Sequence, residues 1–177
     1  MKVGIIGCGF IGSEIANFID NNKNFKLTAA NDVDKIKFHE LIKKLKYNKP
    51  KFIELNELIE KCDLIIESAT KNVIKDVLSN KNLDFKNKKL LVMSTGGLIN
   101  NINLLKKIKS CEILLPSGAI AGLDSIKSIS GKIKSLTLTT TKPLKGLEGA
   151  PYIVKNSIDL SSIKGKKVLF EGNLQEA

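Results

Sequence analysis

The sequence contains no arginine and no tryptophan, and His39 is its single histidine. All 29 basic residues are lysines, which give a formal net charge of +11 but are scattered along the chain. Proteins that bind bases and phosphates commonly use the bidentate fork of arginine and stacking aromatic rings, and aromatic residues make up only 5% of this chain. We therefore interpret the lysine excess as a compositional bias and expect no nucleic-acid partner.

Cysteine and long hydrophobic runs are also scarce. Cys8, Cys62 and Cys111 are far apart and odd in number, and each lies in or beside an apolar run, which favours buried free thiols over a disulfide or a metal site. No apolar stretch reaches the roughly 18 to 20 residues that a membrane span needs, and glycines interrupt the first one. We expect a cytoplasmic protein with no membrane partner and no metal.

Short apolar runs alternate with amphipathic segments over the first 115 residues. The predicted strands cover residues 3–6, 26–32, 51–55, 63–69, 88–95 and 111–115. The segments between these strands have the apolar spacing of helices, and Asn56 is a candidate N-cap for one short helix. Because parallel neighbours need crossover connections, this alternation predicts an α/β fold, a doubly wound Rossmann sheet with helices on both faces.

In the first predicted helix, four apolar residues share one face and are expected to meet the core: Ile11, Ile15, Phe18 and Ile19. A later stripe predicts one continuous helix over residues 98–108.

The pattern changes after Pro116. A glycine-rich stretch leads into a short helical segment, and residues 134–143 alternate like a strand with one solvated or ligand-facing side. Residues 116–177 are too few to cover such a strand with partners. We therefore expect a dinucleotide-binding domain over residues 1–115 and an incomplete α+β second domain over residues 116–177.

The first strand runs into a G-x-G-x-x-G motif that opens a helix. Gly7 suits the tight turn, Gly9 allows the backbone to approach a pyrophosphate, and Gly12 allows the helix to lie close to the strand. The helix N-terminus offers free N–H groups to phosphates. Asp32 ends the next strand, about 20 residues on, where an acidic residue can bind the ribose hydroxyls. Together these features predict a dinucleotide site.

The identity of the dinucleotide stays open between NAD and NADP. The carboxylate of Asp32 would repel a 2′-phosphate and favours NAD, whereas Lys35 and Lys37 lie just beyond it and could tolerate NADP. Asp32 has an alternative role as a helix cap before Lys35.

Three polar or glycine-rich stretches follow predicted strands at the edge where open α/β sheets bind ligands: residues 67–70, 94–97 and 116–119. Each could equally be an ordinary turn with a capping hydroxyl. His39 lies in a helix away from that edge and is interpreted as solvated surface. Lys142 is a candidate contact for an anionic substrate.

These motifs resemble those of the L-aspartate dehydrogenases. The likeness runs through IGCGFIG, NDVD, IIESAT, VMSTGGL, LPSGAIAGLDSIKS and LTLTTTKP, in matching order along nearly the whole chain. The first motif is common to Rossmann enzymes, whereas residues 116–125 are far more specific. The resemblance implies oxidative deamination of L-aspartate with NAD or NADP. The iminoaspartate formed hydrolyses to oxaloacetate and ammonia or feeds NAD biosynthesis.

The resemblance also implies roles for particular residues. The cofactor-binding turn and ribose acid correspond to Gly7, Gly9, Phe10, Ile11, Gly12 and Asp32, and the nicotinamide side to Ala69, Thr70, Ser94 and Ala119. Family members are longer, and the histidine assigned as catalytic lies beyond Ala177. We therefore expect a partial form, with no catalytic residue in 1–177, that binds cofactor with little turnover. The complete protein is expected to be a homodimer.

Two other functions remain open at this stage. One is a catalytically silent dinucleotide-binding protein, and the other is a related dehydrogenase, such as one acting on homoserine or a dihydrodipicolinate.

Overall fold

The computed structural model describes residues 1–99, 101–106, 108, 110–117 and 122–173. The chain divides into two compact units, Met1–Ala119 and Ile120–Ala177. Each unit is described by itself.

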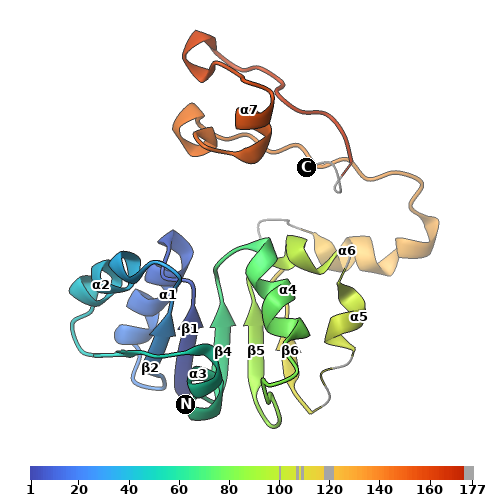
Figure 1. The fold of residues 1–177 in the computed structure, drawn as a ribbon. Helices are drawn as coiled ribbons and strands as arrows, with labels where there is room; N and C mark the ends of the chain where they lie inside the picture. The colour runs from blue at the N-terminus through green and yellow to red at the C-terminus, as the bar shows by residue number, and fades with distance from the viewer. Residues whose placement is uncertain (100, 107, 109, 118–121, 174–177) are drawn as a thin grey trace. The chain divides into compact units, whose positions relative to one another are not determined.

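The first unit is built on one six-stranded parallel sheet (Figure 1). Its strands are β1 (Lys2–Ile6), β2 (Lys26–Asn31), β3 (Lys51–Phe52), β4 (Leu64–Glu67), β5 (Lys89–Val92) and β6 (Glu112–Leu114). They lie in the order β3-β2-β1-β4-β5-β6, and every pair is parallel. The strand order reverses between β1 and β4, so the predicted doubly wound Rossmann sheet is confirmed.

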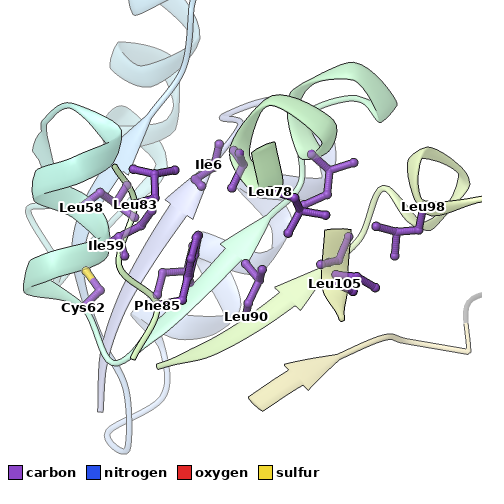
Figure 2. Packing of buried hydrophobic residues seen from close by; sticks show 14 of the residues in the cluster. Ile6, Leu58, Ile59, Cys62, Leu78, Leu83, Phe85, Leu90, Leu98 and Leu105 are labelled. Carbon is purple, nitrogen blue, oxygen red and sulfur yellow. The ribbon is translucent and has the colours of Figure 1, made fainter. Parts of the chain in front are cut away.

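Helices cover both faces of this sheet because successive strand residues point to opposite sides. From β1, Val3 and Ile5 pack with α1 (Phe10–Asp20) and α2 (Lys35–Lys44), whereas Ile6 packs on the opposite face. The helices on that opposite face are α3 (Leu55–Lys61), α4 (Lys71–Ser79) and the short α5 (Ile102–Leu105). Figure 2 shows Leu58 and Leu78 from these helices among the residues packed above the strands.

The core-facing side of α1 differs from the prediction. Phe18 is 64% exposed and Ile11 is 49% exposed, whereas Ile19 is buried as predicted and Ile15 packs partly buried against the core. Gly12 and Ala16 also lie on the buried side. The physical reason is the close approach of the helix to the turn after β1, which leaves room there only for small side chains.

Two further local predictions are wrong. Asn56 lies inside α3, whose N-cap is Glu54, so it does not cap the helix. Over residues 98–108 the helix is interrupted: a 3₁₀ turn, η1 (Thr95–Leu98), is followed by α5 alone. Two residues of the predicted apolar stripe, Leu98 and Leu105, are nevertheless buried in the core.

A buried carboxylate joins the end of α1 to the loop after α2. Asp20 is 5% exposed and accepts hydrogen bonds from the backbone N–H groups of Lys46, Tyr47 and Asn48 and from the Asn48 amide. Burial alone raises the pKa of Asp20, but these hydrogen bonds outweigh it and hold the pKa at about 2. Asp20 therefore stabilises the first unit as a carboxylate.

The second unit contains short helices in its described residues, α6 (Leu123–Ser128) and α7 (Pro151–Lys155), with 3₁₀ turns η2 (Ser130–Lys132), η3 (Leu144–Leu147) and η4 (Leu160–Ser162). The strand predicted over 134–143 does not form, and these residues are exposed and irregular. A strand needs a hydrogen-bonded neighbour, and no described segment of this unit supplies one.

Among all described helices, none combines the length and the apolar character that a membrane crossing needs.

Candidate functional site

The carboxyl ends of four neighbouring strands meet at one edge of the sheet in the first unit. Gly7 follows β1, Asp32 follows β2 by one residue, Ser68 follows β4, and Ser94 lies just beyond β5. Because all strands are parallel, these residues share that edge (Figure 1). The predicted turn after β1 and the acid after β2 thus lie on adjacent strands.

Gly7 makes the turn that the sequence predicts. Its φ of +96° lies in the left-handed region, and its N–H donates to the Asn31 carbonyl at 2.8 Å. A Cβ at this position would lie 2.6 Å from the backbone nitrogen of Ala69, so the turn packs directly against the segment after β4. Ser68 reinforces this contact by donating its hydroxyl to the Gly7 carbonyl at 3.0 Å.

Gly12 and Gly9 have different roles in the motif. A Cβ on Gly12 would lie 2.0 Å from the Gly7 carbonyl oxygen, so only glycine allows α1 to approach the turn so closely. A Cβ on Gly9 would meet nothing within 4 Å. Gly9 is the N-cap residue of α1 and has no side chain that could accept from the first N–H groups of the helix. The helix N-terminus is therefore open to an anion. The space above Gly9 fits the close approach of a pyrophosphate.

Asp32 is held in place by two backbone donors. Its Oδ2 accepts from the Cys8 N–H at 2.7 Å, and its Oδ1 accepts from the Asp34 N–H at 2.8 Å. The alternative role as a helix cap is wrong, because Asp34 caps α2 by accepting from the Ile36 N–H. Asp32 therefore stays at the sheet edge beside the glycine turn.

The loops after β4 and β5 are joined by Glu67, the first residue of the candidate stretch 67–70, in a role that the sequence did not predict. Glu67, the last residue of β4, is fully buried, and its carboxylate accepts from the Ala69 N–H, the Ser94 N–H and the Ser94 hydroxyl. The available signal was an acidic residue ending the otherwise apolar strand LIIE.

The remaining predicted residues are placed as follows. Phe10 is 83% exposed at the start of α1, and Thr70 is the N-cap residue of α4, although its side chain does not cap the helix. Pro116 and Ser117 follow β6, whereas Gly118 and Ala119 lie outside the described residues. Lys142 is exposed in the second unit.

His39 is exposed on α2, with Nδ1 2.7 Å from the Lys35 carbonyl oxygen, which confirms the interpretation as helix surface. Within the described ranges no cluster of histidine, cysteine and acidic side chains could hold a metal.

The three cysteines are free thiols. Burial raises the pKa of Cys8 to about 12, with a further contribution from the charge of Asp32, and burial raises the pKa of Cys62 to about 11. Burial also raises the pKa of the half-buried Cys111. All three are protonated near neutral pH and are poor nucleophiles.

An open hollow of about 440 Å³ is lined by residues that include Lys26, Tyr47, Lys51 and Lys61. Lys26 and Lys51 begin β2 and β3, so this hollow lies at the amino ends of the strands, away from the glycine turn.

Comparison with known proteins agrees with this geometry. Residues 1–115 match the family model described as dihydrodipicolinate reductase, N-terminus, and residues 124–177 match the model described as aspartate dehydrogenase, C-terminal. The chain is 41% identical to a protein from Methanococcoides burtonii named L-aspartate dehydrogenase, across all of this chain and 67% of that protein.

The chain belongs to the L-aspartate dehydrogenase family.

Other members of the aspartate dehydrogenase family match over the same length. A protein of that name from Nitrosopumilus maritimus is 36% identical, with 99% of this chain and 66% of that protein aligned. The crystal structure of aspartate dehydrogenase from Thermotoga maritima superposes with a TM-score of 0.64 at 25% identity, covering 99% of this chain and 66% of that one. The chain therefore spans about two thirds of the length of these relatives. The family resemblance read from the sequence is confirmed.

Proposed function

We propose that the first unit binds NAD or NADP along the carboxyl edge of β2, β1, β4 and β5. The supporting observation is the paired glycine turn and acid: Gly9 is open to a pyrophosphate at the N-terminus of α1, and Asp32 is fixed beside it by the Cys8 N–H. Phe10, Ile11, Gly7 and Gly12 complete the turn in this proposal.

In this arrangement the nicotinamide half lies along the turns after β4 and β5. The residues that would line it are Ala69, Thr70 and Ser94, with Ala119 beyond β6. The supporting geometry is the contact between Gly7 and Ala69, which places the turn after β4 directly beside the glycine turn. This keeps the two halves of an extended dinucleotide on adjacent strands.

The charge beside the ribose favours NAD. The carboxylate of Asp32 is available at the site edge and would repel a 2′-phosphate. Lys37 is exposed on α2 and close enough to lower the pKa of Cys8, so a cation lies near the same turn and NADP can be accepted.

The reaction that we propose for the protein is the oxidative deamination of L-aspartate. When bound, NAD or NADP would supply the acceptor for the hydride of the substrate Cα, and the iminoaspartate formed would hydrolyse to oxaloacetate and ammonia or enter NAD biosynthesis. The chain's own contribution in the first unit is to bind and orient the cofactor. The proton transfer of deamination needs an acid–base group, and His39 on the surface of α2 does not supply it.

We further propose that residues 1–115 are the dinucleotide-binding domain and that residues 116–177 belong to a domain for substrate binding and dimerisation. A homodimer in the cytoplasm, with no nucleic-acid or membrane partner, fits the composition and the family. Lys142 is the candidate contact for a substrate carboxylate.

An activity assay tests the function. The chain is incubated with NAD⁺ or NADP⁺ and with L-aspartate, D-aspartate or L-homoserine, and reduced cofactor is followed by absorbance. Formation with L-aspartate alone supports the proposal, and formation with L-homoserine alone contradicts it. Cofactor binding without turnover on any of these substrates would contradict the proposed activity and support the alternative of a catalytically silent dinucleotide-binding protein.

A further inference from the structure

Glu67 occupies an unusual position for an acidic residue. It is the last residue of β4 in the middle of the sheet, it lies in register with Ile6 of β1 and Val92 of β5, and its side chain is 0% exposed. Burying a carboxylate costs free energy unless hydrogen bonds compensate for the lost water. A hydrophobic side chain could fill this position in the core without that cost. The presence of a carboxylate therefore indicates a specific role for its hydrogen bonds.

The hydrogen bonds of Glu67 indicate that reason. Oε1 accepts from the Ala69 N–H at 2.8 Å and from the Ser94 hydroxyl at 2.9 Å, and Oε2 accepts from the Ser94 N–H at 3.1 Å. All three partners donate, so both oxygens of the Glu67 side chain act as acceptors. One side chain therefore bridges the turn after β4 and the turn after β5.

We propose that Glu67 is the positioning residue for the nicotinamide half of the site, fixing the separation of the turns that carry Ala69 and Ser94. This inference rests on the proposed cofactor site. It also explains how the turn after β4 keeps its place beside the glycine turn. The Ala69 nitrogen that Glu67 accepts from is the atom that a Cβ on Gly7 would approach to 2.6 Å, so a shift of Ala69 changes the contact with the turn.

The chemistry of the amide predicts what Glu67→Gln does. A glutamine offers one oxygen and one NH₂ in place of two acceptors. In either orientation the NH₂ faces a backbone N–H, that of Ala69 or that of Ser94, and one turn loses its anchor. Ser94→Ala is milder, because it removes only the hydroxyl bond and keeps both backbone bonds.

The test compares two ligands on the full chain. NADH carries the nicotinamide, whereas ADP-ribose carries only the adenosine, pyrophosphate and second ribose. For Glu67→Gln we expect the dissociation constant for NADH to rise about tenfold or more, which is about 1.4 kcal/mol, while that for ADP-ribose changes less than about twofold. Ser94→Ala should raise the NADH constant by a smaller factor of about three.

Glu60→Gln is the matched control, since Glu60 is an exposed glutamate on α3 and the same change there should alter neither constant. Circular dichroism of each variant verifies folding, and Glu67→Asp, which keeps the charge but shortens the side chain, carries the test if Glu67→Gln does not fold. Equal weakening of both ligands, or no change in either, would overturn the positioning role. If the unmodified chain binds neither ligand, the proposed cofactor site itself is wrong. If the unmodified chain binds both ligands and Glu67→Gln binds them equally well, the cofactor site stands and only the role of Glu67 is wrong.

Discussion

The carboxylate of Asp32 accepts a hydrogen bond from the backbone N–H of Cys8 at a distance of 2.7 Å. This bond connects the residue after β2 to the turn after β1, so it joins the proposed ribose contact to the proposed pyrophosphate turn. A second bond, from the Asp34 N–H to the other carboxylate oxygen, fixes the orientation of the side chain. In the proposed site the same acid would hold the turn in place and present its carboxylate to the ribose of the cofactor.

Asp32→Asn should shift cofactor preference towards NADP. Removing the charge relieves repulsion of a 2′-phosphate, so we expect the ratio of NADPH to NADH affinity to rise by roughly tenfold. NADH affinity itself should fall, because the amide cannot accept from both the Cys8 and the Asp34 N–H groups. Fluorescence titration with each reduced cofactor measures both effects.

Asp34→Asn is the charge-matched control for that experiment. It removes the same charge two residues later, and asparagine keeps the N-cap bond to the Ile36 N–H. An equal shift in preference in this variant would mean that net charge near α2, and not Asp32, sets the selectivity.

Alanine at two of the three motif glycines, Gly9 and Gly12, should give opposite results. Gly12→Ala puts a Cβ 2.0 Å from the Gly7 carbonyl oxygen and should destabilise the first unit by about 1–3 kcal/mol. Gly9→Ala meets nothing within 4 Å and has φ −68°, so its effect on thermal stability should be small. It should nevertheless weaken NADH binding by roughly tenfold, because its Cβ occupies the path of the pyrophosphate. Unchanged NADH binding in Gly9→Ala would contradict the placement of the phosphates.

Asp20 makes stability depend on acid pH. Its pKa falls from 3.8 to about 2 on folding, so its contribution is complete above 3.8 and is lost as the pH falls from 3.8 through about 2. At neutral pH, Asp20→Asn should cost about 2 kcal/mol, because three backbone N–H groups lose a charged acceptor. Urea unfolding at a series of pH values should show the two proteins converging towards pH 2, and a constant difference would be inconsistent with this role.

The thiols should react in order of burial. With a chromogenic disulfide reagent at mildly alkaline pH, Cys111 should react first, because it is only half-buried. Cys8 and Cys62, whose pKa values burial raises to about 12 and about 11, should react only on unfolding in urea. Rapid labelling of Cys8 in the folded chain would show that the glycine turn opens. Variants in which one cysteine at a time is replaced by serine identify which thiol has reacted.

Local patterns predicted most of the first unit. The apolar runs predicted the positions of the strands. The glycine spacing and the position of Asp32 predicted that these residues lie together at the carboxyl edge of the sheet. These features depend on residues that are close in sequence and on two general rules for parallel sheets. Parallel strands need crossover connections, and ligands bind at the carboxyl ends of the strands, so one sequence is enough to predict them.

Features set by distant contacts could not be predicted. Besides the nearby Ala69, Glu67 bonds to Ser94, 27 residues later, and no residue near Glu67 in the sequence indicates that contact. The buried side of α1 depends on how closely Gly12 approaches Gly7 in space, so the apolar count favoured Ile11 and Phe18 wrongly. The alternation over 134–143 met the strand pattern, but a pattern does not supply the neighbouring strand.

A titration of the 177-residue chain with NADH, followed by cofactor fluorescence, tests the proposed dinucleotide site most directly. We expect saturable binding at one site per chain that is weakened roughly tenfold in Gly9→Ala, with the fold of that variant intact by circular dichroism. Absence of saturable binding by the folded chain, or equal binding by the folded Gly9→Ala variant, would contradict a dinucleotide site at the carboxyl edge of the sheet.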